Sequence, residues 1–282
     1  MAIMNNEKYL VIGATGTVGS ELVKILKTKG KSVRLTSSKA ANGPDFAHIN
    51  LATGEGMSAA FEGIERAFFL CPLGFVDQYA ILSSLIQEAK RRELKKVVLL
   101  TGMSANEDET SSMRRAEVEL ENSGLTYNIL RPNWFLQNFN TFWVQTIKEQ
   151  GKILLPAGNA KTSFIDAKDI SAVAAELLTS DKFNNKDFDL TGPQALDFNE
   201  VAEEISAVSG KKVVYQEITP EELRQGLLGA GMPADVTEFF LKILGYLKAG
   251  HCSRTTNCVE EILGREPRSI KDYTQENKQA WA

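Results

Sequence analysis

Three glycines, at positions 13, 16 and 19, lie where a run of apolar residues gives way to a helical pattern. Residues 9–12 predict a short buried strand, and apolar positions recur with a helical period from residue 18 onward. A helix that follows a tight turn begins with unpaired backbone N–H groups and the positive end of the peptide dipoles, which together attract anions. We therefore interpret the segment as a phosphate-binding turn: Gly13 permits the turn, Gly16 admits a pyrophosphate to the main chain, and Gly19 allows the helix to pack closely on the strand.

The spacing of these glycines, G-x-x-G-x-x-G, differs from the G-x-G-x-x-G of the standard dinucleotide fingerprint. A plain turn from strand to helix is the alternative interpretation. The order of strand, turn and helix near the start of the chain is that of the first βα unit in a doubly wound domain. The sequence therefore favours a dinucleotide site.

A second strand is predicted over residues 31–36, and its end bears on the kind of dinucleotide. A carboxylate at this place binds the ribose hydroxyls of NAD, whereas a basic residue accommodates the extra phosphate of NADP. The chain has Ser37, Ser38 and Lys39 here and no carboxylate before Asp45. We therefore predict NADP(H) in preference to NAD(H), with a solvated polar loop as the alternative.

Two further apolar runs, residues 67–70 and 97–100, predict central strands of a parallel sheet. Ligands of such sheets bind beyond the carboxyl ends of the strands. The residues that follow these strands, and that we expect at the cofactor cleft, are Cys71, Pro72, Leu73, Thr101 and Met103. Cys71 is interpreted as a packing residue, because no nearby basic side chain would lower the pKa of its thiol.

Aromatic side chains gather after a strand predicted over residues 126–130, beginning with Trp134 and Phe135. They could form part of the core or the wall of a pocket for a flat substrate, and the sequence leaves both interpretations open. The later segment 220–250 has a mostly helical pattern and predicts a lid, with Met232 among its apolar anchors. These three side chains are the predicted pocket residues.

A chain of 282 residues with 43% hydrophobic residues can hold one large α/β domain and a smaller lobe. We assign residues 1–150 mainly to a dinucleotide-binding domain, with later segments returning to it, and residues 151–282 mainly to a substrate or lid lobe. The formal charge of −4 disfavours a broad electrostatic footprint, so no nucleic-acid partner is expected.

No run of residues approaches the roughly 18 consecutive apolar residues of a membrane span, and the N-terminus lacks a signal-peptide pattern. We therefore expect a cytoplasmic location and no membrane partner. Three cysteines and two histidines fit reduced thiols better than a metal site, and no metal is predicted.

Six motifs occur in order along the chain, and together they resemble one family. They lie at residues 9–19, 70–72, 125–138 with a Leu-Arg-Pro-Asn-x-Phe core, 164–170, 190–193 and 264–268. They resemble the NmrA-like branch of the atypical short-chain dehydrogenase/reductases over nearly the whole chain. The resemblance implies an α/β fold with a Rossmann-type doubly wound parallel sheet that binds NAD(P)(H), and a small C-terminal α+β lobe.

The resemblance also implies cofactor contacts. For the pyrophosphate these are Gly13, Thr15, Gly16, Thr17 and Val18, and for the 2′-phosphate they are Ser38 and Lys39. The remaining contacts are Asn50 and Leu51 near adenine, Cys71, Pro72, Thr101 and Met103 near the ribose and nicotinamide, and Asn133, which completes the set.

The chain departs from short-chain dehydrogenases in its proton donor. Those enzymes use a Tyr-x-x-x-Lys pair to protonate a developing alkoxide, but the aligned positions here are Glu109 and Met113, and no tyrosine has a lysine four residues later. No catalytic residue is therefore assigned. A quinone or a conjugated cation can accept hydride and take its proton from solvent, so we predict an NAD(P)H-dependent reductase of a small quinone-like or conjugated electrophile. The alternative is a non-catalytic NADP(H)-sensing regulatory protein that binds a protein partner.

Overall fold

The chain forms two compact units in the computed structural model, which describes residues 7–39, 43–72 and 74–282. Unit 1 comprises Met1–Pro132 and Ala167–Asp189, and unit 2 comprises Asn133–Asp166 and Leu190–Ala282. Each unit thus consists of two segments of the chain. The division of roles near residue 150 stays a prediction, and Leu73 lies outside the described residues.

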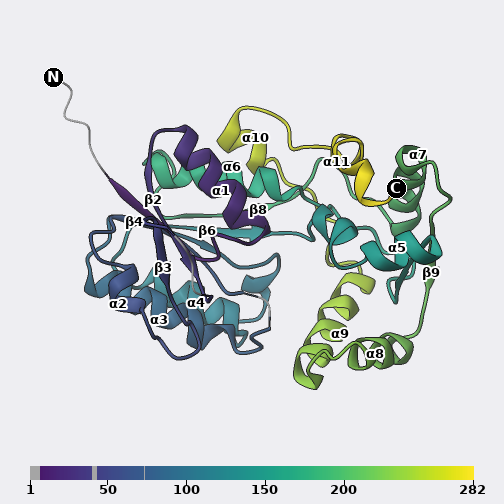
Figure 1. Ribbon diagram of the computed structural model, residues 1–282, viewed down its shortest axis with the longest axis horizontal. Coiled ribbons are helices and arrows are strands. Elements are labelled where there is room, and N and C mark those ends of the chain that lie inside the picture. Colours follow the sequence, from purple (N-terminus) through teal and green to yellow (C-terminus); the bar gives the residue numbers. More distant parts are fainter. Residues whose placement is uncertain (1–6, 40–42, 73) are drawn as a thin grey trace. The chain divides into compact units, whose positions relative to one another are not determined.

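Unit 1 is built on a sheet that contains seven strands in the described part of the chain (Figure 1). In sheet order the strands are β3 (Phe46–His48), β2 (Ser32–Ser37), β1 (Lys8–Val11), β4 (Arg66–Leu70), β5 (Lys96–Leu100), β6 (Tyr127–Pro132) and β8 (Lys186–Leu190). The strand pairs from β3 to β6 are parallel. This order is that of the doubly wound dinucleotide-binding fold, so the predicted Rossmann-type sheet is confirmed.

Helices cover both faces of this sheet. They are α1 (Thr17–Thr28), α2 (Met57–Ala60), α3 (Gln78–Arg91), the 3₁₀ turn η1 (Ala105–Glu107), α4 (Ser112–Glu121) and α6 (Ala167–Thr179). The helix α1 packs on α6, whereas α3 packs on α2 and α4 (Figure 1). On the α3 side, Leu10, Phe69 and Leu99 of the strands join one buried cluster with Leu85 and Leu120 of the helices. Alternate side chains of each strand thus face one helical layer.

The strand β3 is short, and the cause is local. It ends at His48, because Asn50 turns the chain. The Asn50 Oδ1 atom accepts hydrogen bonds from the backbone N–H groups of Ala52 at 3.0 Å and Thr53 at 3.3 Å. A short amide side chain that bonds its own backbone in this way favours a turn over a strand.

Unit 2 is an α+β unit with its own core. Its two strands, β7 (Lys152–Leu155) and β9 (Val214–Glu217), pair in parallel. Its helices are η2 (Leu136–Asn140), α5 (Val144–Gln150), α7 (Phe198–Ser209), α8 (Pro220–Gly229), α9 (Ala234–Lys248), α10 (Cys258–Leu263), α11 (Ile270–Asn277) and η3 (Lys278–Ala280). Phe139, Phe198 and Trp281 are fully buried at its centre. The predicted helical segment 220–250 is two helices, since Gly231 at φ 84° and Pro233 interrupt it.

Neither a membrane-spanning helix nor a cluster of metal-binding side chains occurs in the described residues. Among residues 7–39, 43–72 and 74–282, no helix is long and apolar enough to cross a membrane. The same part of the chain contains no group of three or more His, Cys, Asp or Glu side chains placed to hold a metal ion.

Candidate active site

The turn between β1 and α1 has the geometry that its glycine spacing predicts. Gly13 adopts a φ of 71°, a left-handed conformation that favours glycine, and its carbonyl accepts a hydrogen bond from the N–H of Gly16 at 2.9 Å. A Cβ atom on Gly19 would lie 2.1 Å from the Gly13 carbonyl oxygen. A side chain at either position would therefore distort the turn, and the structural roles predicted for Gly13 and Gly19 are confirmed.

The first turn of α1 presents backbone donors without a side-chain partner. Gly16 is the N-cap residue and supplies no side-chain hydrogen bond, and the first turn has no acidic residue. Thr15, Gly16 and Thr17 are exposed, whereas Val18 is buried in the core. Such a helix start attracts an anion. Phosphate binding by these residues stays a prediction that this geometry fits.

The end of β2 carries the residues predicted to hold a 2′-phosphate. Ser38 and Lys39 are exposed there, and the Lys39 N–H donates a hydrogen bond to Ser37 Oγ at 3.1 Å. Because β2 is the parallel neighbour of β1, its carboxyl end lies at the same sheet edge as the glycine turn. Arg34, on the same strand, instead donates to three backbone carbonyls at and just after α2. Lys39 is then the last lysine or arginine in the sequence before Arg66.

Asn50 and Leu51, predicted near adenine, follow β3. The Asn50 side chain is used within its own turn, and Leu51 is half-buried against the core of unit 1. Their side chains thus stabilise this corner of the fold. Contact with adenine stays a prediction.

Cys71 and Pro72 follow β4 and are half-buried. Burial, together with the negative charge of Asp77, raises the pKa of the Cys71 thiol to about 12. The thiol is therefore protonated at neutral pH, and a protonated thiol is a poor nucleophile. This supports the interpretation of Cys71 as a packing residue.

Thr101 and Met103 follow β5, and their backbones are tied to the neighbouring strand β6. The Thr101 N–H donates to the Leu130 carbonyl at 2.9 Å, and the Met103 N–H donates to the Pro132 carbonyl at 3.0 Å. Both side chains are half-buried. The loop after β5 is therefore held at the carboxyl edge of the sheet, where ligands of this fold bind.

The positions aligned with the Tyr-x-x-x-Lys pair do not form an acid–base pair. The side chain of Glu109 is 70% exposed and forms an ion pair with Arg114 at 3.2 Å. Met113 lies in the first turn of α4, with its sulfur beside Gly102. A thioether cannot donate a proton or lower the pKa of a neighbour, so these two positions do not replace the Tyr/Lys pair.

A buried ion pair between Glu117 and Arg131 was not found from the sequence. Glu117, on α4, is fully buried, and Arg131 of β6 donates to both its carboxylate oxygens, from Nε at 2.9 Å and from Nη2 at 2.8 Å. Burial alone would lower the pKa of Arg131, but the Glu117 and Asp187 carboxylates raise it. The available signal was a carboxylate at a core-facing position of a helix, where charged residues are rare unless they are paired.

Asn133, the last predicted cofactor residue, lies in unit 2 and is buried. Its amide nitrogen donates to Ser163 Oγ at 2.7 Å and to the Cys252 carbonyl at 2.8 Å, and its Oδ1 accepts from the N–H of Trp134 at 2.9 Å. These bonds fix the start of the segment that carries the predicted pocket residues. A direct cofactor contact of Asn133 stays a prediction.

Trp134 belongs to an aromatic cluster in unit 2 that is partly exposed. Its ring stacks on Trp143 at 6.3 Å and meets the edge of Phe240, on α9, at 6.2 Å. Phe240 in turn lies 5.0 Å from Phe142, whose side chain is 42% exposed. Phe240 could not be connected to Trp134 from the sequence, because the two residues are far apart along the chain. Trp143 is core, whereas Phe142 is accessible, and a pocket wall for a flat substrate stays a prediction.

Phe135 and Met232, the other predicted pocket residues, are both half-buried. Phe135 forms a β-bridge with Ile165, and Met232 lies between α8 and α9 against the same core as Trp134. Unit 2 thus brings Trp134 and Met232 to one cluster. Substrate contact of the three residues stays a prediction.

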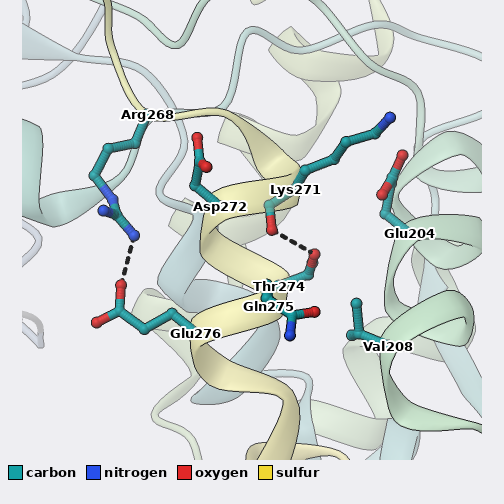
Figure 2. A pocket seen from close by; sticks show the side chains of 8 residues that line it. All are labelled: Glu204, Val208, Arg268, Lys271, Asp272, Thr274, Gln275 and Glu276. Atoms are coloured by element: carbon teal, nitrogen blue, oxygen red, sulfur yellow. Dashed lines mark hydrogen bonds and ion pairs between the residues drawn. The ribbon is translucent and has the colours of Figure 1, made fainter.

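A groove of about 630 Å³ lies in unit 2 where α11 packs on α7 (Figure 2). Its lining residues are Glu204, Val208, Arg268, Lys271, Asp272, Thr274, Gln275 and Glu276. Arg268 donates to Glu276 at 2.5 Å and to the buried Asp166 at 2.7 Å. The charges are of mixed sign, and none of the predicted site residues lines the groove, so no role in cofactor or substrate binding is assigned to it.

Comparison with known proteins gives relatives along the full length of the chain. The chain is 32% identical to an NAD(P)H azoreductase from Xenophilus azovorans, with 96% of this chain and 98% of that protein covered. Its fold is like that of triphenylmethane reductase from Citrobacter sp. in complex with NADP(H), with a TM-score of 0.80, 21% identity and coverage of 96% and 99% of the two chains. It is also like that of an NADPH-dependent quinone oxidoreductase from Escherichia coli in complex with NADPH, with a TM-score of 0.82, 18% identity and coverage of 95% and 99%.

The two solved structures show the fold, and the family follows from the sequence. The model of the NmrA-like family matches residues 5–274. The predicted motifs at both ends of the chain lie within this match. The chain therefore belongs to the NmrA-like family.

Proposed function

We propose that the chain is an NAD(P)H-dependent reductase that transfers hydride to a small quinone-like or conjugated electrophile. The observation that carries the proposal is the first turn of α1, which follows the exposed residues Thr15 and Gly16 and has no side-chain cap and no acidic residue. The named relatives support it, because the proteins to which the chain is similar are an azoreductase, a dye reductase and a quinone oxidoreductase. The sensing alternative has no such support.

The residues of unit 1 fit a dinucleotide. Gly13, Gly16 and Thr17 would hold the pyrophosphate through the backbone, since Gly13 and Gly16 have no side chain and Thr17 is exposed. Ser38 and Lys39 would hold a 2′-phosphate, which supports a preference for NADP(H) over NAD(H). An ammonium group and a hydroxyl are suitable partners for a phosphate dianion.

The chemistry follows from what the chain supplies and what it lacks. When bound, the reduced nicotinamide supplies a hydride. The chain contributes positioning but no Tyr/Lys pair, and its Cys71 thiol, with a pKa of about 12, is not an effective acid at neutral pH. A substrate that needs a proton in the same step is therefore a poor one. Quinones, iminium ions and conjugated cations suit the site, because they can take up hydride first and a proton from water afterwards.

We propose that unit 2 binds the acceptor through Trp134, Phe135 and Met232, together with Phe240. Their exposed or half-buried aromatic and thioether groups suit a flat, polarisable molecule. Small-molecule acceptors are then the partners of the protein, and its cytoplasmic location stays a prediction.

The test is turnover of purified protein with NADPH or NADH against a panel of quinones, azo dyes, triphenylmethane dyes and iminium ions, followed by loss of reduced-nicotinamide absorbance. We expect steady turnover with at least one conjugated class and a higher kcat/KM with NADPH. Tight NADPH binding without turnover on any acceptor would favour the sensing alternative. Absence of binding to either dinucleotide would overturn the proposal.

A further inference from the structure

The hydroxyl group of Thr101, at the carboxyl end of β5, has a defined hydrogen-bond direction. Its Oγ lies 2.6 Å from Glu117 Oε1 and 3.5 Å from the Leu130 carbonyl oxygen. A threonine hydroxyl has one hydrogen to donate and lone pairs that accept. The Leu130 carbonyl has no hydrogen to give, and Glu117 Oε1 already accepts a hydrogen bond from Arg131 Nε at 2.9 Å, so Thr101 donates to one of them.

Arginine donors surround the Glu117 carboxylate. Arg131 forms a bidentate hydrogen-bonded ion pair with the Glu117 carboxylate, and Arg114 Nη1 adds a third donor at 3.3 Å. Glu117 is fully buried and the Arg131 side chain is 3% exposed. A carboxylate in such a contact is acceptor-only. The short bond from Thr101 therefore points its hydrogen at Glu117 rather than at Leu130.

Thr101 Oγ can therefore only accept a hydrogen bond from a ligand, because its own hydrogen is directed at Glu117. Thr101 is half-buried, and in the described part of the chain its Oγ receives no hydrogen bond. A ligand group that meets this oxygen must bring a hydrogen of its own. The reduced nicotinamide riboside offers two kinds of donor, the ribose hydroxyls and the carboxamide NH₂.

We propose that Glu117, held by Arg131, is a positioning residue that fixes the Thr101 hydroxyl as an acceptor for an N–H or O–H donor of the nicotinamide riboside. The inference rests on the proposed function, because it requires that the dinucleotide binds at this sheet edge. It adds the direction of the hydrogen bond, with Thr101 as the acceptor and the cofactor as the donor, which the sequence does not predict. It also gives the buried ion pair a role in orienting the cofactor.

The experiment measures dissociation constants of the full chain for three ligands: NADPH, its 3-acetylpyridine analogue, which lacks the carboxamide N–H, and adenosine 2′,5′-bisphosphate, which lacks the nicotinamide half. In Thr101→Val, which has nearly the same shape, we expect NADPH binding to weaken about 3- to 10-fold, as for one lost hydrogen bond. Binding of the adenosine bisphosphate should not change. Thr101→Ser should keep the wild-type affinities, because it keeps the hydroxyl.

The analogue identifies the donor. Weakened binding of NADPH alone indicates the carboxamide, and equal weakening of NADPH and the analogue indicates a ribose hydroxyl. Thr179→Val is the matched control, since the Thr179 hydroxyl donates within α6 to the Ala175 carbonyl at 2.7 Å and all three affinities should persist. Glu117→Gln provides a second test if the variant folds. An amide NH₂ group that donates to Thr101 Oγ would occupy the lone pair meant for the cofactor, so the affinity for NADPH should fall as it does in Thr101→Val.

Two results would overturn the inference. One is unchanged NADPH affinity in Thr101→Val. The other is equal weakening of all three ligands in that variant, which would indicate damage to the fold rather than loss of one contact. Absence of dinucleotide binding has a different signature, because the wild-type chain would then bind none of the three ligands and both proposals would fall together. Binding of NADPH without turnover would overturn the reductase proposal and leave the role of Thr101 standing.

Discussion

The start of α1 allows a substitution in which helix stability and cofactor binding change in opposite directions. Thr17 is the first helical residue, it is exposed, and the first turn of α1 has no acidic side chain. In Thr17→Asp, the new carboxylate meets the positive end of the helix dipole, which stabilises a helix by about 0.3–1 kcal/mol. The same carboxylate would stand beside a bound pyrophosphate.

The size of the repulsion follows from Coulomb's law. Two unit charges 4 Å apart interact by about 1 kcal/mol in bulk water and by about 4 kcal/mol at the effective dielectric constant of a protein surface. Thr17 is exposed, so we expect a value toward the lower limit, about 1–2 kcal/mol. This corresponds to about 5- to 30-fold weaker binding of NADPH.

The assay pairs NADPH titration, followed by tryptophan fluorescence, with urea unfolding of the same variant. We expect weaker binding together with a free energy of unfolding equal to or above that of the wild type, and a smaller binding defect at high salt because mobile ions screen the repulsion. Asn199→Asp is the control, since it adds the same charge in the first turn of α7, in unit 2. Unchanged NADPH affinity in a stably folded Thr17→Asp variant would refute the assignment of the pyrophosphate to this turn.

Three further predictions concern the rest of the candidate site. Lys39→Ala should lower kcat/KM with NADPH several-fold and leave that with NADH nearly unchanged, and an equal loss with both would contradict the 2′-phosphate assignment. The Cys71 thiol, with its pKa raised from 9.0 to about 12, should resist alkylation up to about pH 11. Between pH 9 and pH 12 the thiol is deprotonated to a greater extent in the unfolded chain than in the folded one, so it lowers the free energy of unfolding as the pH rises. Cys71→Ala should remove this loss when unfolding is measured as a function of pH. Phe240→Ala should raise the KM for an aromatic acceptor about 2- to 10-fold, as expected for one lost aromatic contact beside Trp134, with no change in NADPH affinity; Tyr246→Ala, which removes an exposed ring from the same helix, is its control.

The glycine turn was predictable because its causes are local. The positions of Gly13, Gly16 and Gly19 relative to one strand and one helix determine the backbone path, and all three lie within seven consecutive residues. The central strands of the sheet were predictable for a related reason. An apolar run of four or five residues between helical patterns is typical of a buried strand of a parallel sheet.

The other parts of the site depend on long-range packing. Glu117 and Arg131 meet because α4 lies on β6, and neither residue has a motif that names its partner. Phe240 reaches Trp134 only when α9 folds onto the core of unit 2. The strand β9 also has little apolar pattern, because Val214 is its one aliphatic residue and is exposed. Such contacts are seen only in the three-dimensional structure, because the hydrophobic periodicity of a sequence describes single helices and strands and not the contacts between them.

The division of the chain into two discontinuous units limits how this protein can be made and altered. Unit 1 is completed only by α6 and β8, which lie after the first segment of unit 2, so a ribosome must synthesise residue 189 before all seven described strands of the sheet exist. A truncation after residue 132 would therefore remove an edge strand and one helical cover, and would not isolate a cofactor-binding module. If unit 2 binds the acceptor as proposed, an exchange of acceptor specificity between relatives would need two transplanted segments, residues 133–166 and 190–282, moved together.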